Sequence, residues 1–288
     1  MRVLDASGRS NIALVGARQH PLTDLYHRLL SMPWPVLIAL LGLFYVSANA
    51  MFATLYVLGG DVIEHARPHS FLDAFFFSIQ TMATIGYGTM APRGLYANSL
   101  VALESLVGLL GFAVATGLMY SKFAQPRARV LFSNVALVTR REGMPCLIFR
   151  MANQRANQLV EAHLRAVIAT NSFTAEGEPI RRVEDLRFLR SESPVFAFSW
   201  TAIHPIDELS PLNGLSAAEL AERDAEIIVV LSGIDDTFSQ TVHARRSYVA
   251  AEIVWNARFV DVLSVSADGR RSVDLTRFHD VVPVGAPQ

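Results

Sequence analysis

The chain has few charged residues, one cysteine and one lysine. Charged residues make up 18% of its 288 residues, and Cys146 is the single cysteine. One cysteine excludes an intrachain disulfide framework and a zinc site built from several cysteines. A formal net charge of −1 provides no overall attraction to nucleic acid. Because 51% of the residues are hydrophobic, the composition also excludes a disordered chain.

Two long stretches contain almost no charge. The stretch from Trp34 to Gly60 has no Asp, Glu, Lys, Arg or His, and the stretch from Ala97 to Ser121 has one charged residue, Glu104. An α-helix of about 20 apolar residues can cross a hydrocarbon core of about 30 Å. The first stretch begins too late in the chain and is too long to be the apolar part of a signal peptide. We therefore predict two transmembrane helices rather than two buried core helices.

A shorter apolar stretch, residues 69–83, lies between the two predicted spans. It is too short to cross a membrane, and it is bounded by Pro68 and by glycines. Such a segment between two spans predicts a re-entrant helix. Backbone outside a helix is tolerated at membrane depth only inside protein or along a water-filled path. The segment therefore indicates a pore.

Basic residues lie beside the two predicted spans. Arg28 precedes the first span, and Lys122, Arg127 and Arg129 follow the second. The positive-inside rule then places both chain termini in the cytoplasm. Leucines at helical spacing between residues 22 and 30 predict a short amphipathic helix on the inner membrane surface, or alternatively an ordinary cap on a globular domain.

The chain beyond residue 126 has the pattern of a β protein. Runs at 160–168, 195–206 and 225–231 predict strands. Asp268-Gly269 between runs at 259–265 and 271–275 predicts a hairpin, and Ser216 with Glu219 predicts a capping box for a short helix at 217–223. We predict an N-terminal segment at 1–33, a transmembrane domain at 34–126 and an all-β sandwich at 127–288.

The re-entrant stretch is followed by five residues: Thr84, Ile85, Gly86, Tyr87 and Gly88. Rings of backbone carbonyls from four such segments can replace the hydration shell of a potassium ion. The carbonyls point inward only if some residues adopt dihedral angles that glycine adopts at low steric cost, which explains Gly86 and Gly88. We expect Tyr87 to brace the segment against the preceding helix and the Thr84 hydroxyl to act at its inner end. Since one chain supplies a quarter of each ring, the sequence predicts a homotetramer.

Longer stretches carry a family resemblance. They are FFFSIQTMATIGYG at 75–88, SKFAQPRAR at 121–129, SWTAIHPIDELSPL at 199–212 and HARRSYVAAEIVWNARF at 243–259. From about residue 22 onward the chain resembles the prokaryotic inward rectifier potassium channels of the KirBac family. The resemblance implies a multi-pass protein of the bacterial inner membrane with an immunoglobulin-like cytoplasmic domain. It also implies a channel rather than an enzyme, with K⁺ ions in the pore and no cofactor.

The resemblance further implies gates and regulatory sites at matching positions. Gly108 matches a hinge glycine in the second span, and Phe112 and Tyr120 match constrictions near the bundle crossing. A further constriction, the G-loop, matches Gly233, Ile234, Asp235, Asp236, Thr237, Phe238, Ser239 and Gln240. Candidates for binding anionic phospholipids are Arg28, Lys122, Arg127 and Arg129, since basic residues beside a span are attracted to anionic headgroups by about 1 kcal/mol each.

Several matched positions differ from eukaryotic members of that family. Phe112 and Ser232 stand where strongly rectifying channels have acidic residues, whereas Glu176 matches an acidic residue of the cytoplasmic pore. Candidate pore blockers are Ba²⁺, Mg²⁺ and polyamines, but the two missing acids argue against strong rectification. Gln80 and Met90 replace a Glu–Arg pair that supports the selectivity filter of those channels, which residues 84–88 match.

Glu104 and the histidines leave alternatives open. A carboxylate in the middle of a span costs about 2.5–3.5 kcal/mol, so Glu104 faces protein or water. It lies either near the filter, where it affects ion occupancy, or behind the filter as a hydrogen-bonded or neutral structural group. The channel is gated by lipid or, alternatively, by a soluble ligand or pH at the β domain. The titratable candidates are His204 and His243 in the β domain and His27 in the predicted amphipathic helix. A membrane sensor that conducts nothing is the other alternative, and ion flux distinguishes it.

Overall fold

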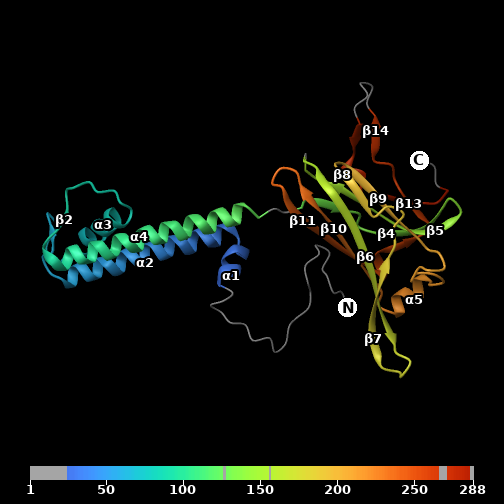
Figure 1. The fold of residues 1–288 in the computed structure, drawn as a ribbon, viewed down its shortest axis with the longest axis horizontal. Helices are drawn as coiled ribbons and strands as arrows, with labels where there is room; N and C mark the ends of the chain where they lie inside the picture. The colour runs from blue at the N-terminus through green and yellow to red at the C-terminus, as the bar shows by residue number, and fades with distance from the viewer. Residues whose placement is uncertain (1–24, 126–127, 156, 266–270, 286–288) are drawn as a thin grey trace. The chain divides into compact units, whose positions relative to one another are not determined.

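The computed structural model describes residues 25–125, 128–155, 157–265 and 271–285. By their internal contacts the described residues fall into two compact units, a helical unit up to Gln125 and a β-rich unit from residue 128 onward (Figure 1). The division lies beside the predicted end of the transmembrane domain at residue 126.

The helical unit has helices joined by a loop with a short β-ribbon. α1 (Leu25–Ser31) precedes α2 (Trp34–Leu58), and a loop containing β1 (Ile63–Glu64), α3 (Phe71–Met82) and β2 (Ala91–Pro92) leads to α4 (Gly94–Phe123). A proline lies in the first turn of α2, where its missing N–H is not needed. Ser70 caps α3 by accepting a hydrogen bond from the N–H of Asp73 at 3.3 Å. β1 and β2 pair antiparallel and so close the loop that carries α3.

α2 and α4 have the length and composition of membrane spans. They are 25 and 30 residues long, and only 28% and 6% of their apolar segments are buried within the chain. The core helix of a soluble domain would be mostly buried. The two helices predicted from the charge-poor stretches are therefore confirmed as long helices with exposed apolar surfaces.

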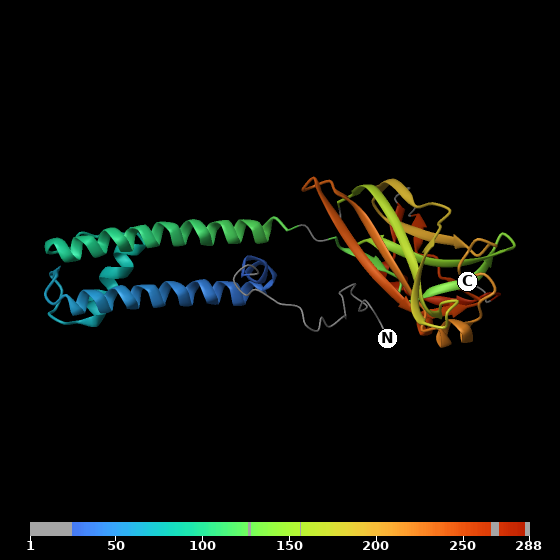
Figure 2. The same cartoon turned by 60° about the horizontal axis from the view of Figure 1, so that its bottom comes forward.

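α3 lies between the ends of α2 and α4 (Figure 2). Its buried face belongs to an apolar cluster with residues of both long helices, which includes Phe52, Tyr56, Phe77 and Ala97. The rings of Tyr56 and Phe77 meet edge to face with their centroids 5.2 Å apart. The predicted re-entrant segment is thus a helix that α2 and α4 hold in place.

Within its described residues, the β-rich unit has two five-stranded sheets. One sheet has the order β11-β10-β6-β7, with β8 also pairing with β6, and the other has the order β12-β4-β5-β3, with β9 also pairing with β5. The first contains β6 (Leu159–Phe173), β7 (Pro179–Leu186), β8 (Glu192–Phe196), β10 (Glu226–Asp235) and β11 (Gln240–Val249). The second contains β3 (Val130–Phe132), β4 (Ala136–Arg141), β5 (Met144–Asn153), β9 (Ser199–Pro205) and β12 (Ile253–Trp255).

Short elements lie around the sheets. β13 (Ala257–Phe259) pairs with β16 (Val281–Pro283), β14 (Leu263–Val265) pairs with β15 (Arg271–Val273), and 3₁₀ turns cover Ala250–Glu252 and Leu275–Arg277. α5 (Ala217–Glu222) begins with a capping box. The Ser216 side chain accepts from the Glu219 N–H, and the Glu219 carboxylate accepts from the Ser216 N–H, so this prediction is confirmed.

The two sheets share one apolar core. In β10, buried and partly exposed residues alternate along most of the strand, as expected when one face lies on a core. Phe149 of β5, Leu164 of β6, Ile227 of β10 and Tyr248 of β11 belong to a single cluster and are at most 2% exposed. Because these residues come from both sheets, the predicted β-sandwich is confirmed.

The strands differ from the prediction in several places, and the predicted runs do not include β3, β4, β5, β7 or β11. The run at 195–206 is divided between β8 in one sheet and β9 in the other. The run at 259–265 is also divided, because β13 pairs with β16 and β14 pairs with β15. β10 continues four residues beyond the predicted end at Leu231, to Asp235. Strand-forming residues continue through the first two places, so composition does not mark where the pairing partner changes. The extra end of β10 contains Gly233 and Asp235, which are uncommon in strands, so composition does not predict this extension.

Candidate functional site

The segment at 84–88 leaves α3 as non-helical backbone. The N–H groups of Thr84 and Ile85 donate to carbonyls of the last turns of α3 at 3.0 and 2.8 Å. Gly86 and Gly88 have φ angles of +62° and +78°, in the left-handed region that glycine adopts at low cost. The predicted need for glycine at both positions is confirmed. Thr84 also has a positive φ, of 54°.

Within the described part of one chain, nothing covers this segment. All five of its residues are exposed, and 71% of Tyr87 is accessible. Tyr87 therefore does not brace the segment against α3 within a single chain, and its bracing role stays a prediction. Such a contact would have to come from another copy.

Ion pairs hold the loop on both sides of α3. The Nε and Nη2 atoms of Arg67 donate to the carboxylate of Asp73 at 2.9 and 2.8 Å. After β2, Arg93 lies 3.6 Å from Asp61 and 3.7 Å from Glu64. The Arg67 pair ties the chain before α3 to its first turn, and the Arg93 pairs tie that chain to the chain after the 84–88 segment.

Gly108 allows α4 to approach the C-terminal end of α3. A Cβ atom at this position would lie 2.6 Å from the carbonyl oxygen of Met82 and 2.9 Å from its Cγ. α4 continues as a helix through Gly108. The structure thus has Gly108 in a close packing contact, and its role as a hinge stays a prediction.

Phe112 and Tyr120 project from α4 with little packing in the chain. Each is 74% exposed. Large rings that do not pack within one chain are available to contact other copies or to line a path between them. Their role as constrictions stays a prediction.

Glu104 lies behind α3, away from the exposed faces of α4. It is fully buried, and its carboxyl group contacts the hydroxyls of Tyr56 in α2 and Ser78 in α3. Of the two placements that the sequence leaves open, the structure has the one behind the filter segment.

Lys122, a candidate for lipid binding, contacts the end of α1. Its Nζ donates to the carbonyl of Leu30 at 2.7 Å and to that of Met32, and it lies 5.4 Å from the centre of the Trp34 ring. A cation at a helix C-terminus satisfies carbonyls that the helix leaves without partners. Lys122 therefore links α4 to the corner between α1 and α2.

The other basic candidates lie in separate parts of the chain. Arg28 is exposed on α1, Arg129 is exposed just before β3, and Arg127 lies outside the described residues. Arg28 belongs to the helical unit and Arg129 to the β-rich unit. Binding of phospholipid stays a prediction.

The predicted G-loop is a tight turn between two paired strands. The register of β10 with β11 runs to Asp235↔Gln240, so only residues 236–239 lie outside the strands. Gly233 lies at a register shift against β6, where a Cβ atom would be 3.3 Å from the carbonyl oxygen of Val160. Phe238 in the turn is 52% exposed.

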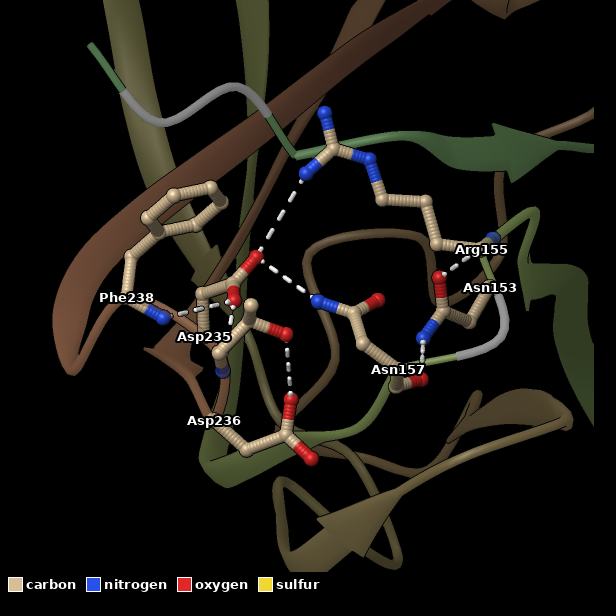
Figure 3. Close-up of polar contacts among 7 residues, drawn as sticks. Asn153, Arg155, Asn157, Asp235, Asp236 and Phe238 are labelled. Atoms are coloured by element: carbon tan, nitrogen blue, oxygen red, sulfur yellow. Dashed lines mark hydrogen bonds and ion pairs between the residues drawn. The ribbon is translucent and has the colours of Figure 1, made fainter. Parts of the chain in front are cut away.

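The carboxylate of Asp235 organises this turn (Figure 3). Its Oδ1 accepts from the N–H groups of Thr237 at 3.0 Å and Phe238 at 3.3 Å, and its Oδ2 accepts from the side-chain amide of Asn157 at 2.8 Å. Nη1 of Arg155 lies 3.5 Å from the same Oδ2. Asp235 is only 1% exposed, so Arg155 compensates its buried charge. Removal of the Arg155 side chain would leave the Asp235 carboxylate without this ion pair.

The sequence alone does not single out Arg155 and Asn157. They follow β5 in a polar run whose composition is typical of any exposed loop. Their partner Asp235 lies 78 residues beyond Asn157. Only the pairing of β6 with β10 brings the two parts of the chain together.

Glu176 lies at the tip of the hairpin between β6 and β7. The G-loop turn pairs with the start of β6 at Leu159, whereas Glu176 follows the other end of the strand. At about 3.3 Å per residue, β6 separates them by roughly 45 Å along the strand. A hydrogen bond with Thr174 lowers the pKa of Glu176. The place of Glu176 in the cytoplasmic pore stays a prediction, and the exposed Glu161 lies nearer the turn.

Known proteins resemble the chain over nearly its whole length. The family described as "Inward rectifier potassium channel C-terminal domain" matches residues 130–288, and the family described as "Ion channel" matches residues 36–125. The chain is 47% identical over 281 residues to Inward rectifier potassium channel Kirbac3.1 of Paramagnetospirillum magnetotacticum, over 97% of this chain and 95% of that protein. It is 33% identical to human Inward rectifier potassium channel 18, over 98% of this chain and 71% of that protein. It is 32% identical to mouse G protein-activated inward rectifier potassium channel 3, over 99% of this chain and 79% of that protein.

The fold and the site define a class of membrane protein. Along the chain, a short helix and an exposed glycine-containing segment lie between two long apolar helices, and a β-sandwich follows. The chain belongs to the inward rectifier potassium channel family and is of the KirBac type. This is a family of ion channels and not of enzymes.

Proposed function

We propose that the protein is a potassium-selective channel of the inward rectifier type, formed by four copies of this chain. The backbone carbonyls of residues 84–88 from the four copies replace the hydration shell of K⁺ as it passes. Conduction is passive and needs no cofactor beyond the permeating ion. The protein lies in the bacterial inner membrane with both termini in the cytoplasm, in keeping with the basic residues beside its spans.

The observation that carries this proposal is the backbone of the 84–88 segment. Gly86 and Gly88 are left-handed, and the segment is uncovered in the single chain. It lies between two helices that are long enough to span a membrane. A pore built from four copies would cover the segment from all sides and align its carbonyls on the axis. Membership of the family supports the same conclusion.

A pair of glycine substitutions tests the filter. Wild-type protein in liposomes should carry K⁺ in preference to Na⁺, with block by Ba²⁺. Gly86→Ala should abolish selective flux, because a left-handed φ costs a residue with a Cβ about 1–2 kcal/mol in each copy. Gly60→Ala is the matched control, since Gly60 has a φ of +87° and open space around it but lies outside the segment. Loss of selectivity in both variants, or in neither, would contradict the proposal.

The gates that we propose lie at the inner end of α4 and at the G-loop turn. In one chain about three quarters of the surfaces of Phe112 and Tyr120 are exposed, and about half of the surface of Phe238 is exposed. Four copies of such rings around an axis would form apolar constrictions, which can gate a pore by excluding water. If the wild type carries no ion in any lipid, Tyr120→Ala distinguishes a closed channel, which should then conduct, from a membrane sensor, which should not.

We also propose that anionic phospholipids modulate the channel. Arg28 is exposed on α1, and Arg129 is exposed at the start of the β-rich unit. Each basic residue near an anionic surface adds about 1 kcal/mol of attraction. Because Lys122 already donates to carbonyls at the end of α1, a headgroup there would compete with an internal contact.

A further inference from the structure

A chain of buried polar groups joins the three membrane helices behind the filter. Glu104 in α4, Ser78 in α3 and Asn49 in α2 are all fully buried. The Tyr56 hydroxyl lies 2.7 Å from Oε2 of Glu104, and the Ser78 hydroxyl contacts the other carboxyl oxygen, Oε1. The Ser78 hydroxyl also lies 2.9 Å from Oδ1 of Asn49. These three oxygen–oxygen contacts each need one proton between the two oxygens.

The orientation of the Asn49 amide is fixed by its other contacts. Its Nδ2 donates to the carbonyl of Tyr45 at 2.8 Å and to the sulfur of Met82 at 3.4 Å. A flipped amide would bring Oδ1 of Asn49 against the backbone carbonyl oxygen of Tyr45, and neither oxygen can donate. Oδ1 of Asn49 therefore faces Ser78 and, as an amide oxygen, can only accept.

Counting protons then assigns the protonation state of Glu104. The Tyr56 and Ser78 hydroxyls carry one proton each, which supplies two of the three contacts. The Ser78 hydroxyl donates its proton to Oδ1 of Asn49, because that amide oxygen carries no proton. The contact between Ser78 and Oε1 of Glu104 is left without a proton unless the carboxyl group carries one.

We infer that Glu104 is a neutral carboxylic acid that donates to Ser78 and accepts from Tyr56, and that it positions α3 behind the filter. With this proton every contact in the chain has one donor and one acceptor. A charged carboxylate would need a cation or several donors at this depth, since burial of an unpaired charge is costly. In the part of the chain that the structure describes, the ion pairs do not include Glu104.

Glu104 is a positioning residue in this inference. It does not touch the filter, but Ser78 lies in the helix that ends at the filter segment. Asn49 extends the same chain of contacts to Met82, the last residue of α3. The cluster therefore joins α3 to α2 through Ser78 and Met82, and to α4 through Ser78. Because Glu104 is neutral in this inference, the cluster places no negative charge behind the ion path.

Infrared spectroscopy of the full-length protein in lipid tests the protonation state. The spectrum of the wild type minus that of Glu104→Gln at neutral pH should contain the carbonyl band of a protonated carboxylic acid, which shifts in D₂O. Glu184→Gln is the matched control, because Glu184 is exposed on β7, and its difference spectrum should contain no carbonyl band of a protonated carboxylic acid. A carboxylate band in place of the acid band for Glu104 would overturn the inference.

Function provides a second readout. Glutamine can donate to Ser78 and accept from Tyr56, so Glu104→Gln should keep the K⁺ selectivity and the Ba²⁺ sensitivity of the wild type, whereas Glu104→Ala should lose selectivity. Weaker Ba²⁺ block in Glu104→Gln would mean that Glu104 acts as a charge and would contradict the inference. This arm rests on the proposed function, while the infrared arm does not depend on conduction, so the two can fail separately.

Discussion

His204 in β9 shows how one buried side chain carries a pH dependence. Its Nδ1 lies 2.6 Å from the carbonyl of Arg187, which can only accept, so Nδ1 carries the proton of the neutral ring. Its Nε2 lies 2.7 Å from the Ser210 hydroxyl and accepts from it. Burial lowers the pKa of His204 below its ordinary value, although Asp207 acts in the opposite direction. The folded domain therefore prefers neutral His204.

Stability should fall when the solution becomes acidic. Below about pH 6.5 the unfolded chain binds a proton at His204 that the folded chain does not bind, so the free energy of unfolding decreases as pH falls. Each unit of pKa difference is worth about 1.4 kcal/mol. Thermal unfolding between neutral and mildly acidic pH should show a steeper loss of stability for the wild type than for His204→Gln. His243→Gln, which replaces an exposed histidine, is the control and should keep the wild-type slope. Equal slopes for the wild type and His204→Gln would exclude His204 as the source.

At the scale of secondary-structure elements, the contact of α3 with α4 depends on one missing side chain. Gly108→Ala would place a methyl group 2.6 Å from a backbone oxygen of Met82, which cannot move without shifting the end of α3. Overpacking of this kind costs about 1–3 kcal/mol. The variant oligomer should unfold at a lower temperature than the wild type.

Gly42→Ala is the matched control for this contact. Gly42 lies in α2, and a Cβ atom added there would meet no atom within 4 Å outside its own stretch of helix. Alanine is favoured over glycine in a helix by up to about 1 kcal/mol, so this variant should be as stable as the wild type or more stable. If Gly108→Ala unfolded at the same temperature as Gly42→Ala, the close contact would not be a determinant of stability.

The helices were largely predictable because their signals are local. The charge-poor stretches predicted α2 and α4, the bounded apolar stretch predicted α3, and Ser216 with Glu219 predicted the start of α5. The division of 195–206 between two sheets was not predictable, because both halves have strand-forming residues and the break depends on pairing with β6 and β5.

At the scale of the whole molecule, the missed features are contacts between distant residues. The partners of Glu104 lie 48 and 26 residues away in the chain. Lys122 donates to backbone carbonyls about 90 residues earlier, and such groups have no sequence signature. The left-handed backbone at Gly86 and Gly88 was predictable because its pattern lies in five consecutive residues. The bracing expected of Tyr87 stays a prediction, because the Tyr87 side chain is exposed in the single chain.

The reversal potential of the wild-type channel in a planar bilayer tests potassium selectivity most directly. With KCl on one side and an equal concentration of NaCl on the other, a pore that does not distinguish the cations has a reversal potential of zero. A filter formed by residues 84–88 of four copies should move the reversal potential far from zero, in the direction set by K⁺, and Ba²⁺ should abolish the current. A reversal potential of zero in the presence of a steady current would show a pore without a potassium filter and would contradict the proposed function.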